Sequence, residues 1–197
     1  MVEPAWIRAN ASSRLYARAG AALLAIAIIF RHTLTSTMAL HMLVHIPMIL
    51  LAGALAGHAC LAGKQCGNVR RLAGRFAKYN DYGIPGLLFV TFMLGYWMIP
   101  RSLDHVLVSA AADSGKFLGL LIAGLLLFDS LRRADKVVRL FFVGNFSWMT
   151  AIAGLLYQEN PARLCNFYLL GDQEVAGMGL VVIAVAVPTL WLWAEYK

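Results

Sequence analysis

The stretch of sequence that decides the fold runs from residue 38 to residue 56 and reads MALHMLVHIPMILLAGALA. An α-helix rises 1.5 Å per residue and the hydrocarbon core of a bilayer is about 30 Å thick, so a stretch of this length can cross a membrane. It contains no Asp, Glu, Lys or Arg, and its titratable side chains are His41 and His45. We interpret it as a transmembrane helix that carries two histidines.

The composition of the whole chain agrees with a membrane protein. The 197 residues are 60% hydrophobic and 14% charged, and the mean hydropathy is +0.69. Soluble domains average about 45–50% apolar and about 25% charged residues. This difference excludes a soluble enzyme, a disordered chain and a nucleic-acid-binding domain. The net charge of +7 comes from basic residues that lie between apolar runs, and the placement of these residues is therefore expected to set the orientation of the chain in a membrane.

Further apolar runs accompany the central one, and they cover residues 20–30, 82–100, 117–128, 137–157 and 175–193. We predict an all-α, polytopic bundle of about six transmembrane helices, forming a single membrane-embedded domain over residues 1–197. The runs at 20–30 and 117–128 are the shortest. If the first of them lies only at the membrane interface, the chain has five spans.

The basic residues predict the orientation of these spans. With the N-terminus inside, 13 of the 17 Lys and Arg residues fall in inside segments, as the positive-inside rule requires. We therefore predict that both termini lie inside. The longest inside loop, 57–80, is basic, and it serves either as a topology determinant or as a contact for anionic lipid or a partner. Cys165 falls in an outside loop, so we expect an impermeant thiol reagent to reach it.

The central run presents histidines and methionines on one helical face. Residues 38, 41, 45 and 48 fall in one stripe of a helix with 3.6 residues per turn, and they are Met38, His41, His45 and Met48. Imidazole with thioether ligands suits copper. We therefore predict a copper site on the outer side, with Asp104 and Asp172 as candidates to complete it. The alternative is a hydrogen-bonded packing role for the two histidines, and helix capping for Asp172.

Three segments resemble the multi-spanning CtaG family of cytochrome c oxidase assembly factors. They are HMLVHIPMILLAG, IPRSLDHVL and GDQEVAGMGL, in this order along the chain. The resemblance implies copper delivery to, or maturation of, a copper-containing respiratory oxidase in the bacterial inner membrane. Residue by residue, it extends to His41, His45, Asp104, Asp172 and Gln173. It also implies integral membrane oxidoreductase subunits as partners.

The sequence departs from this family at one point that concerns the metal. Members often carry a further histidine pair on the helix after the aspartate segment, where this chain has residues 110–116 and ends them with Lys116. A cation there would repel a metal ion. A second hypothesis is therefore a non-catalytic accessory subunit, held stably in a multi-subunit membrane oxidoreductase.

Enzymatic and haem chemistry are not expected. The sequence holds no nucleophile elbow, P-loop or zincin motif, so we predict that the protein is not an enzyme. A membrane cytochrome b needs axial histidines on facing helices, and only the central run carries histidines at depth. We therefore expect no haem within this chain alone.

Overall fold

The computed structural model describes residues 5–62 and 78–195, and within these ranges every regular element is helical. The prediction of an all-α bundle is confirmed. Much of the basic loop predicted at 57–80 lies outside the described residues, so its role stays a prediction.

The membrane-spanning character of the bundle rests on four helical segments. These are long and apolar enough to cross a membrane: Met38–Leu61, Ala110–Arg133, Lys136–Glu159 and Leu170–Glu195. A fifth span is formed if the bent pair Asp81–Trp97 and Pro100–Val108, which meet at 75°, is counted as one. The prediction of about six spans is therefore not confirmed.

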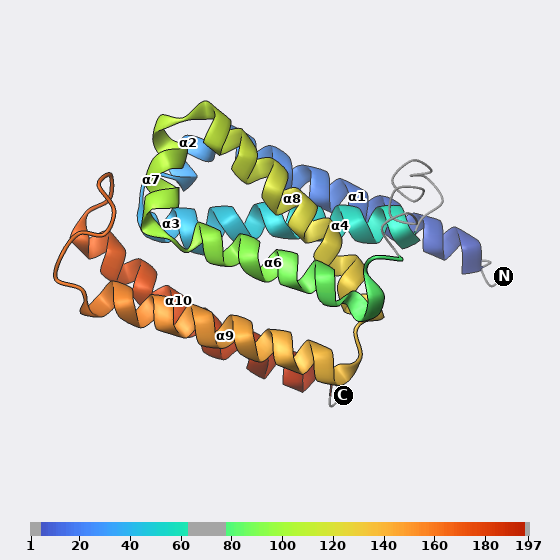
Figure 1. Ribbon diagram of the computed structural model, residues 1–197. Coiled ribbons are helices and arrows are strands. Elements are labelled where there is room, and N and C mark those ends of the chain that lie inside the picture. The colour runs from blue at the N-terminus through green and yellow to red at the C-terminus, as the bar shows by residue number, and fades with distance from the viewer. Residues whose placement is uncertain (1–4, 63–77, 196–197) are drawn as a thin grey trace.

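Helix α1 (Ala5–Ile29) accounts for one of the spans that are not found. It has 25 residues, but its apolar run covers only residues 20–30, about 16 Å of helix and half of a hydrocarbon core. Arg14 and Arg18 lie in its preceding turns. In Figure 1, α1 runs beside α4 (Ile46–Ala62), and Ser13 donates a 2.8 Å hydrogen bond to the carbonyl of Ala59.

Helix α4 packs against α8 (Ala110–Arg133) through paired glycines. A Cβ atom added at Gly124 would lie 2.7 Å from the backbone nitrogen of Ala54, and one added at Gly53 would lie 3.0 Å from Cα of Leu121. Small residues let membrane helices approach closely. This contact sets how α8 faces the histidines of the central segment.

Helices α9 (Lys136–Glu159) and α10 (Leu170–Glu195) form a hairpin with a similar contact. A Cβ at Gly154 would lie 2.7 Å from the carbonyl oxygen of Gly177. At the far end of the hairpin, Glu195 makes ion pairs with Arg139 at 3.2 Å and Lys136 at 3.3 Å. Figure 1 shows this hairpin as a separate layer beside α4, α6 (Ile84–Trp97) and α8.

The helix that follows the basic loop does not run straight through the predicted span 82–100. Helix α6 (Ile84–Trp97) ends before Pro100, and the short helix α7 (Pro100–Val108) turns away. A proline has no backbone N–H to donate to a carbonyl of the preceding helix, and it is favoured in the first turn of a new helix. Asp104 and His105, expected in a loop, are therefore on a helix, with Asp104 buried and His105 exposed.

The two ends of the bundle differ. The start of α1 and the end of α10 lie at one end, and the segments 30–37, 98–109 and 160–169 lie at the other, which we call the histidine end (Figure 1). The larger buried apolar cluster sits toward the histidine end and includes Met38, Trp97, Leu103 and Tyr168. This common end for the start of α1 and the end of α10 agrees with the predicted topology, while its placement inside stays a prediction.

Candidate cation site

The two histidines lie on a π-helical turn. Helices α3 (Met38–Leu40) and α4 are joined by η1 (His41–His45), in which the N–H of Ile46 bonds the carbonyl of His41, five residues back. Thr37 caps the start of this segment, since its hydroxyl accepts from the N–H of Leu40 at 3.2 Å. π-Turns inside α-helices are frequent at functional sites. Both imidazoles are fully buried, and their ring centroids are 5.5 Å apart.

The amine of Lys116 lies between the two imidazoles. Its Nζ is 3.2 Å from Nε2 of His41 and 3.5 Å from Nδ1 of His45, and it is 3.0 Å from Oδ1 of Asp113, one turn earlier on α8. The side chain of Lys116 is completely inaccessible to solvent. A lysine enclosed in this way inside a membrane-spanning helix must find all of its hydrogen-bond partners within the protein.

The outer hydrogen bonds of the imidazoles determine their tautomers. Nε2 of His45 lies 3.2 Å from the carbonyl oxygen of Ala27, which can only accept, so this nitrogen carries the proton. The hydroxyl of Tyr168 donates to the carbonyl of Thr35 at 3.1 Å, so its oxygen accepts from Nδ1–H of His41 at 2.9 Å. Each imidazole therefore turns its lone pair toward Lys116.

The three donors of Lys116 then match three acceptors. An ammonium has three N–H groups, and the acceptors are Asp113 and the two imidazole lone pairs. Arg31 donates to Oδ2 of the same aspartate at 2.9 Å, with its own side chain 49% exposed. These side chains thus form a cluster that extends from the buried ammonium of Lys116 to the guanidinium of Arg31 at the surface of the histidine end.

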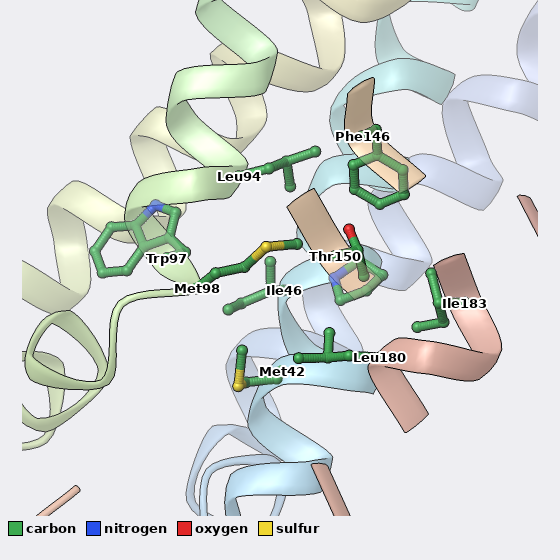
Figure 2. A pocket seen from close by; sticks show the side chains of 10 residues that line it. Met42, Ile46, Leu94, Trp97, Met98, Phe146, Thr150, Leu180 and Ile183 are labelled. Atoms are coloured by element: carbon green, nitrogen blue, oxygen red, sulfur yellow. The ribbon is translucent and has the colours of Figure 1, made fainter. Parts of the chain in front are cut away.

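The predicted methionine ligands lie in packing positions. Met38 is fully buried with its sulfur 4.0 Å from Sγ of Cys165, and Met48 packs half-buried against the main apolar cluster. Met42 lines a small, mostly apolar cavity of about 60 Å³ with Trp97 and Met98, as Figure 2 shows. The same cavity is lined by Thr150, a buried residue whose hydroxyl has no hydrogen-bond partner among the described residues.

The predicted carboxylate ligands also have other partners or positions. Asp104 accepts from the backbone N–H of Asn166 at 2.7 Å and from that of Phe167 at 3.4 Å. Asp172 is half-buried in the first turn of α10, where an acidic residue complements the helix dipole. Among the described residues, no three His, Cys, Asp or Glu side chains are grouped so that they could hold a metal ion. Of the predicted histidine and aspartate ligands, the structure thus brings together only His41 and His45, and copper stays a prediction.

Two members of the cluster were not singled out by the sequence. Tyr168 reaches His41 from a loop 127 residues away, and no motif marks it. Asp113 precedes Lys116 by three residues, and this spacing places both on one helical face. That spacing was the available signal, but it is also the spacing of ordinary surface ion pairs.

Cys165 corrects the expectation of an accessible thiol. It is 2% exposed, and its Sγ lies 3.6 Å from the carbonyl oxygen of Pro100. Burial, assisted by the negative charge of Asp104, raises the pKa of the Cys165 thiol to about 12. Because the thiolate is the reactive form, this cysteine should be protected although it lies in a loop.

Comparisons with protein-family models, with characterised proteins and with solved structures find no match for this chain. The resemblance to the CtaG family therefore rests on its three sequence segments.

Proposed function

We propose that this chain is a membrane-embedded accessory protein of a copper-containing respiratory oxidoreductase, and that it takes part in the assembly or maturation of that complex in the bacterial inner membrane. The observation that carries the proposal is the way the three segments of the resemblance meet. Each of them contacts the loop formed by residues 160–169, which we call the keystone loop.

The contacts of the keystone loop are specific hydrogen bonds. His41 of the first segment bonds Tyr168, and Asp104 of the second accepts from Asn166. Gln173 of the third is 2% exposed, accepts from the N–H of Leu164 at 2.9 Å and donates to the carbonyl of Tyr157 at 3.0 Å. His41, Asp104 and Gln173, which lie far apart in the sequence, thus all bond the keystone loop. This shared contact supports the proposal that the three segments act as one scaffold.

The polar groups of the site favour a non-catalytic role. Lys116, Asp113 and the two histidines use their donors and acceptors on one another and on Tyr168, Arg31 and Ala27. Such a saturated cluster stabilises a bundle. Two imidazole lone pairs directed at one point are also ligands that suit copper among other metals, and they support copper handling only in a state in which the Lys116 amine leaves that point.

A second candidate is a stable, non-catalytic subunit of the same oxidoreductase. The observation that favours it is the position of Lys116, because its amine fills the point at which a metal would bind the imidazoles. A subunit needs no exchangeable metal, whereas a copper-delivery factor does.

Deletion of the gene followed by analysis of the oxidase separates these roles. For an assembly factor, we expect the oxidase to lose copper, as measured by elemental analysis, while the tagged protein is recovered mostly apart from it in mild detergent. For a subunit, we expect one copy per oxidase after crosslinking and gel filtration. Unchanged oxidase copper and amount, together with no co-purification, would rule out both roles.

A matched pair of variants connects the experiment to the site. His41→Ala with His45→Ala should reproduce the effect of the deletion on the oxidase. His58→Ala, on the other end of α4 between the rings of Tyr16 and Phe128, should not.

A further inference from the structure

The position of Lys116 has a geometric consequence for metal binding. Imidazole–metal bonds are about 2.0–2.1 Å long, taking zinc as the guide, whereas Nζ lies 3.2 Å and 3.5 Å from the two acceptor nitrogens. A metal bound to either lone pair would therefore lie within roughly 1–1.5 Å of Nζ. The ammonium and a metal ion cannot occupy the site together.

The tautomers of His41 and His45 make the position of the Lys116 amine a preformed cation site. Nδ1–H of His41 is bound to Tyr168 and Nε2–H of His45 to Ala27, so neither ring can turn its lone pair away without breaking a buried hydrogen bond. The two rings are thus held with acceptors facing one position inside the bundle, in the way that a hydrogen bond from the other ring nitrogen orients a metal-binding histidine. In this chain the position is filled by a cation that belongs to the protein.

We propose that Lys116 is a tethered cation that closes the His41–His45 pair to metal ions, and that the pair binds cuprous ion once this ammonium is removed. The inference rests on the proposed function for its choice of copper, since imidazole alone accepts several metals. Asp113 and Arg31 keep the ammonium of Lys116 in this position. The aspartate holds the ammonium at 3.0 Å, and Arg31 holds the aspartate from the surface.

The charge of the cluster favours a monovalent ion. The two imidazoles are neutral in the tautomers described above, and the ammonium contributes one positive charge to the point that they share. Replacing it with cuprous ion leaves the charge at that point unchanged, whereas a divalent ion adds one. In a site of low dielectric constant, an additional uncompensated charge is strongly unfavourable.

The test compares copper binding by four purified, full-length proteins in the same detergent. They are the wild type, Lys116→Met, the triple variant Lys116→Met with His41→Ala and His45→Ala, and Lys136→Met as the matched control, since Lys136 is an exposed lysine at the opposite end of the bundle. Each is titrated anaerobically with cuprous ion against a chromophoric cuprous chelator, and bound copper is measured by elemental analysis.

The expected result is one additional copper per chain in Lys116→Met, bound at least about a hundredfold more tightly than by the wild type. The triple variant and Lys136→Met should remain at the wild-type level. Equal copper binding by the wild type and Lys116→Met would overturn the proposal, and so would additional copper in Lys116→Met that persists in the triple variant.

A second measurement does not depend on the folding of a variant. An amine-directed reagent is applied to the folded wild type, and modification is read peptide by peptide by mass spectrometry. Lys116 should be modified at least about a hundredfold more slowly than Lys136, because the amine is enclosed and bonded. Similar rates would overturn the tethered-cation proposal. Co-purification with the oxidase is measured separately, so failure of the proposed function and failure of this inference are distinguishable.

Discussion

Asp104 holds Asn166 at two points. Its Oδ2 accepts from the backbone N–H of Asn166 at 2.7 Å and from the side-chain amide at 3.1 Å. Asp104 is 7% exposed, and it connects helix α7 to the keystone loop. This pairing gives Asp104 a structural role, since both of its carboxylate oxygens accept hydrogen bonds from the keystone loop, and its role as a metal ligand stays a prediction.

Replacing Asp104 with Ala should therefore destabilise the histidine end. Hydrogen bonds to a charged acceptor contribute about 1.5–3 kcal/mol each and are not additive, so we expect a loss of about 2–4 kcal/mol in the free energy of unfolding. The measurement is thermal or denaturant unfolding in detergent. Asp81→Ala, at an exposed position on the opposite side of the bundle, is the control and should change stability little. Equal effects of the two variants would contradict the role of Asp104.

Removing the hydroxyl of Tyr168 should destabilise the cation site through His41. In Tyr168→Phe, the buried Nδ1–H of His41 loses its acceptor and the carbonyl of Thr35 loses a donor. A buried polar group without a partner costs about 1–3 kcal/mol, and we expect a loss of that size. Unfolding in detergent measures it, with Tyr82→Phe at an exposed position as the control.

A double-mutant cycle tests whether this loss of stability depends on His41. If it does, Tyr168→Phe should cost much less in a His41→Leu background, because the N–H that needs an acceptor is then absent. Additive effects of the two substitutions would show that the hydroxyl of Tyr168 acts elsewhere.

Cys165 should react with thiol reagents far more slowly than an ordinary cysteine. Its pKa is raised from 9.0 to about 12, so the thiolate fraction at pH 8 falls by about a thousandfold. We expect modification of Cys165, read by peptide mass spectrometry, to increase with pH well beyond 9 and to become fast at pH 8 in denaturant. Asp104→Asn should lower the pKa, since the carboxylate charge is its second cause.

The same shift predicts how stability depends on pH. The unfolded thiol loses its proton above about pH 9 while the folded thiol retains it, so the folded state binds more protons over that range. The contribution of Cys165 to stability should therefore fall as pH rises from about 9 toward 12, by up to about 1.4 kcal/mol per pH unit. Cys165→Ser should remove most of this dependence, and an apparent pKa near 9 in the folded protein would contradict the prediction.

The contact between α4 and α8 should not tolerate a larger side chain at Gly124. A Cβ atom there would lie 2.7 Å from the backbone nitrogen of Ala54 and 2.8 Å from the carbonyl carbon of Gly53, and backbone cannot move aside as a flexible side chain does. We expect Gly124→Ala to cost about 1–3 kcal/mol of unfolding free energy. Gly144→Ala, where a Cβ meets nothing within 4 Å, should be neutral or slightly stabilising.

The same glycine contact bears on the cation site. Separating α8 from α4 moves Lys116 away from the histidines, so Gly124→Ala should also increase modification of Lys116 by an amine-directed reagent. Destabilisation without this increase would show that the two ends of α8 move independently.

The sequence by itself determined the membrane class, the helical fold and the candidate histidine pair. These depend on properties that are local along the chain. An apolar run of about 20 residues favours a helix in a bilayer because unsatisfied backbone groups are costly there. His41 and His45, four residues apart, share a helical face in any arrangement of the other helices. The sequence did not determine the number of spans, since the short run 20–30 adjoins arginines whose charge opposes burial in the membrane.

Only the tertiary structure decided what lies between the two histidines. Lys116 is 75 residues from His41 and Tyr168 is 127 residues from it, and their meeting depends on the rotation of α8 against α4 and on the closure of the keystone loop. Hydropathy and helical periodicity contain no information on either. The glycine contact at Gly53 and Gly124 fixes the rotation of α8 against α4, and the hydrogen bonds of Asp104 and Gln173 fix the closure of the keystone loop. A pair of histidines that reads as a metal site in the sequence thus becomes, in the folded chain, the binding site of the protein's own ammonium group.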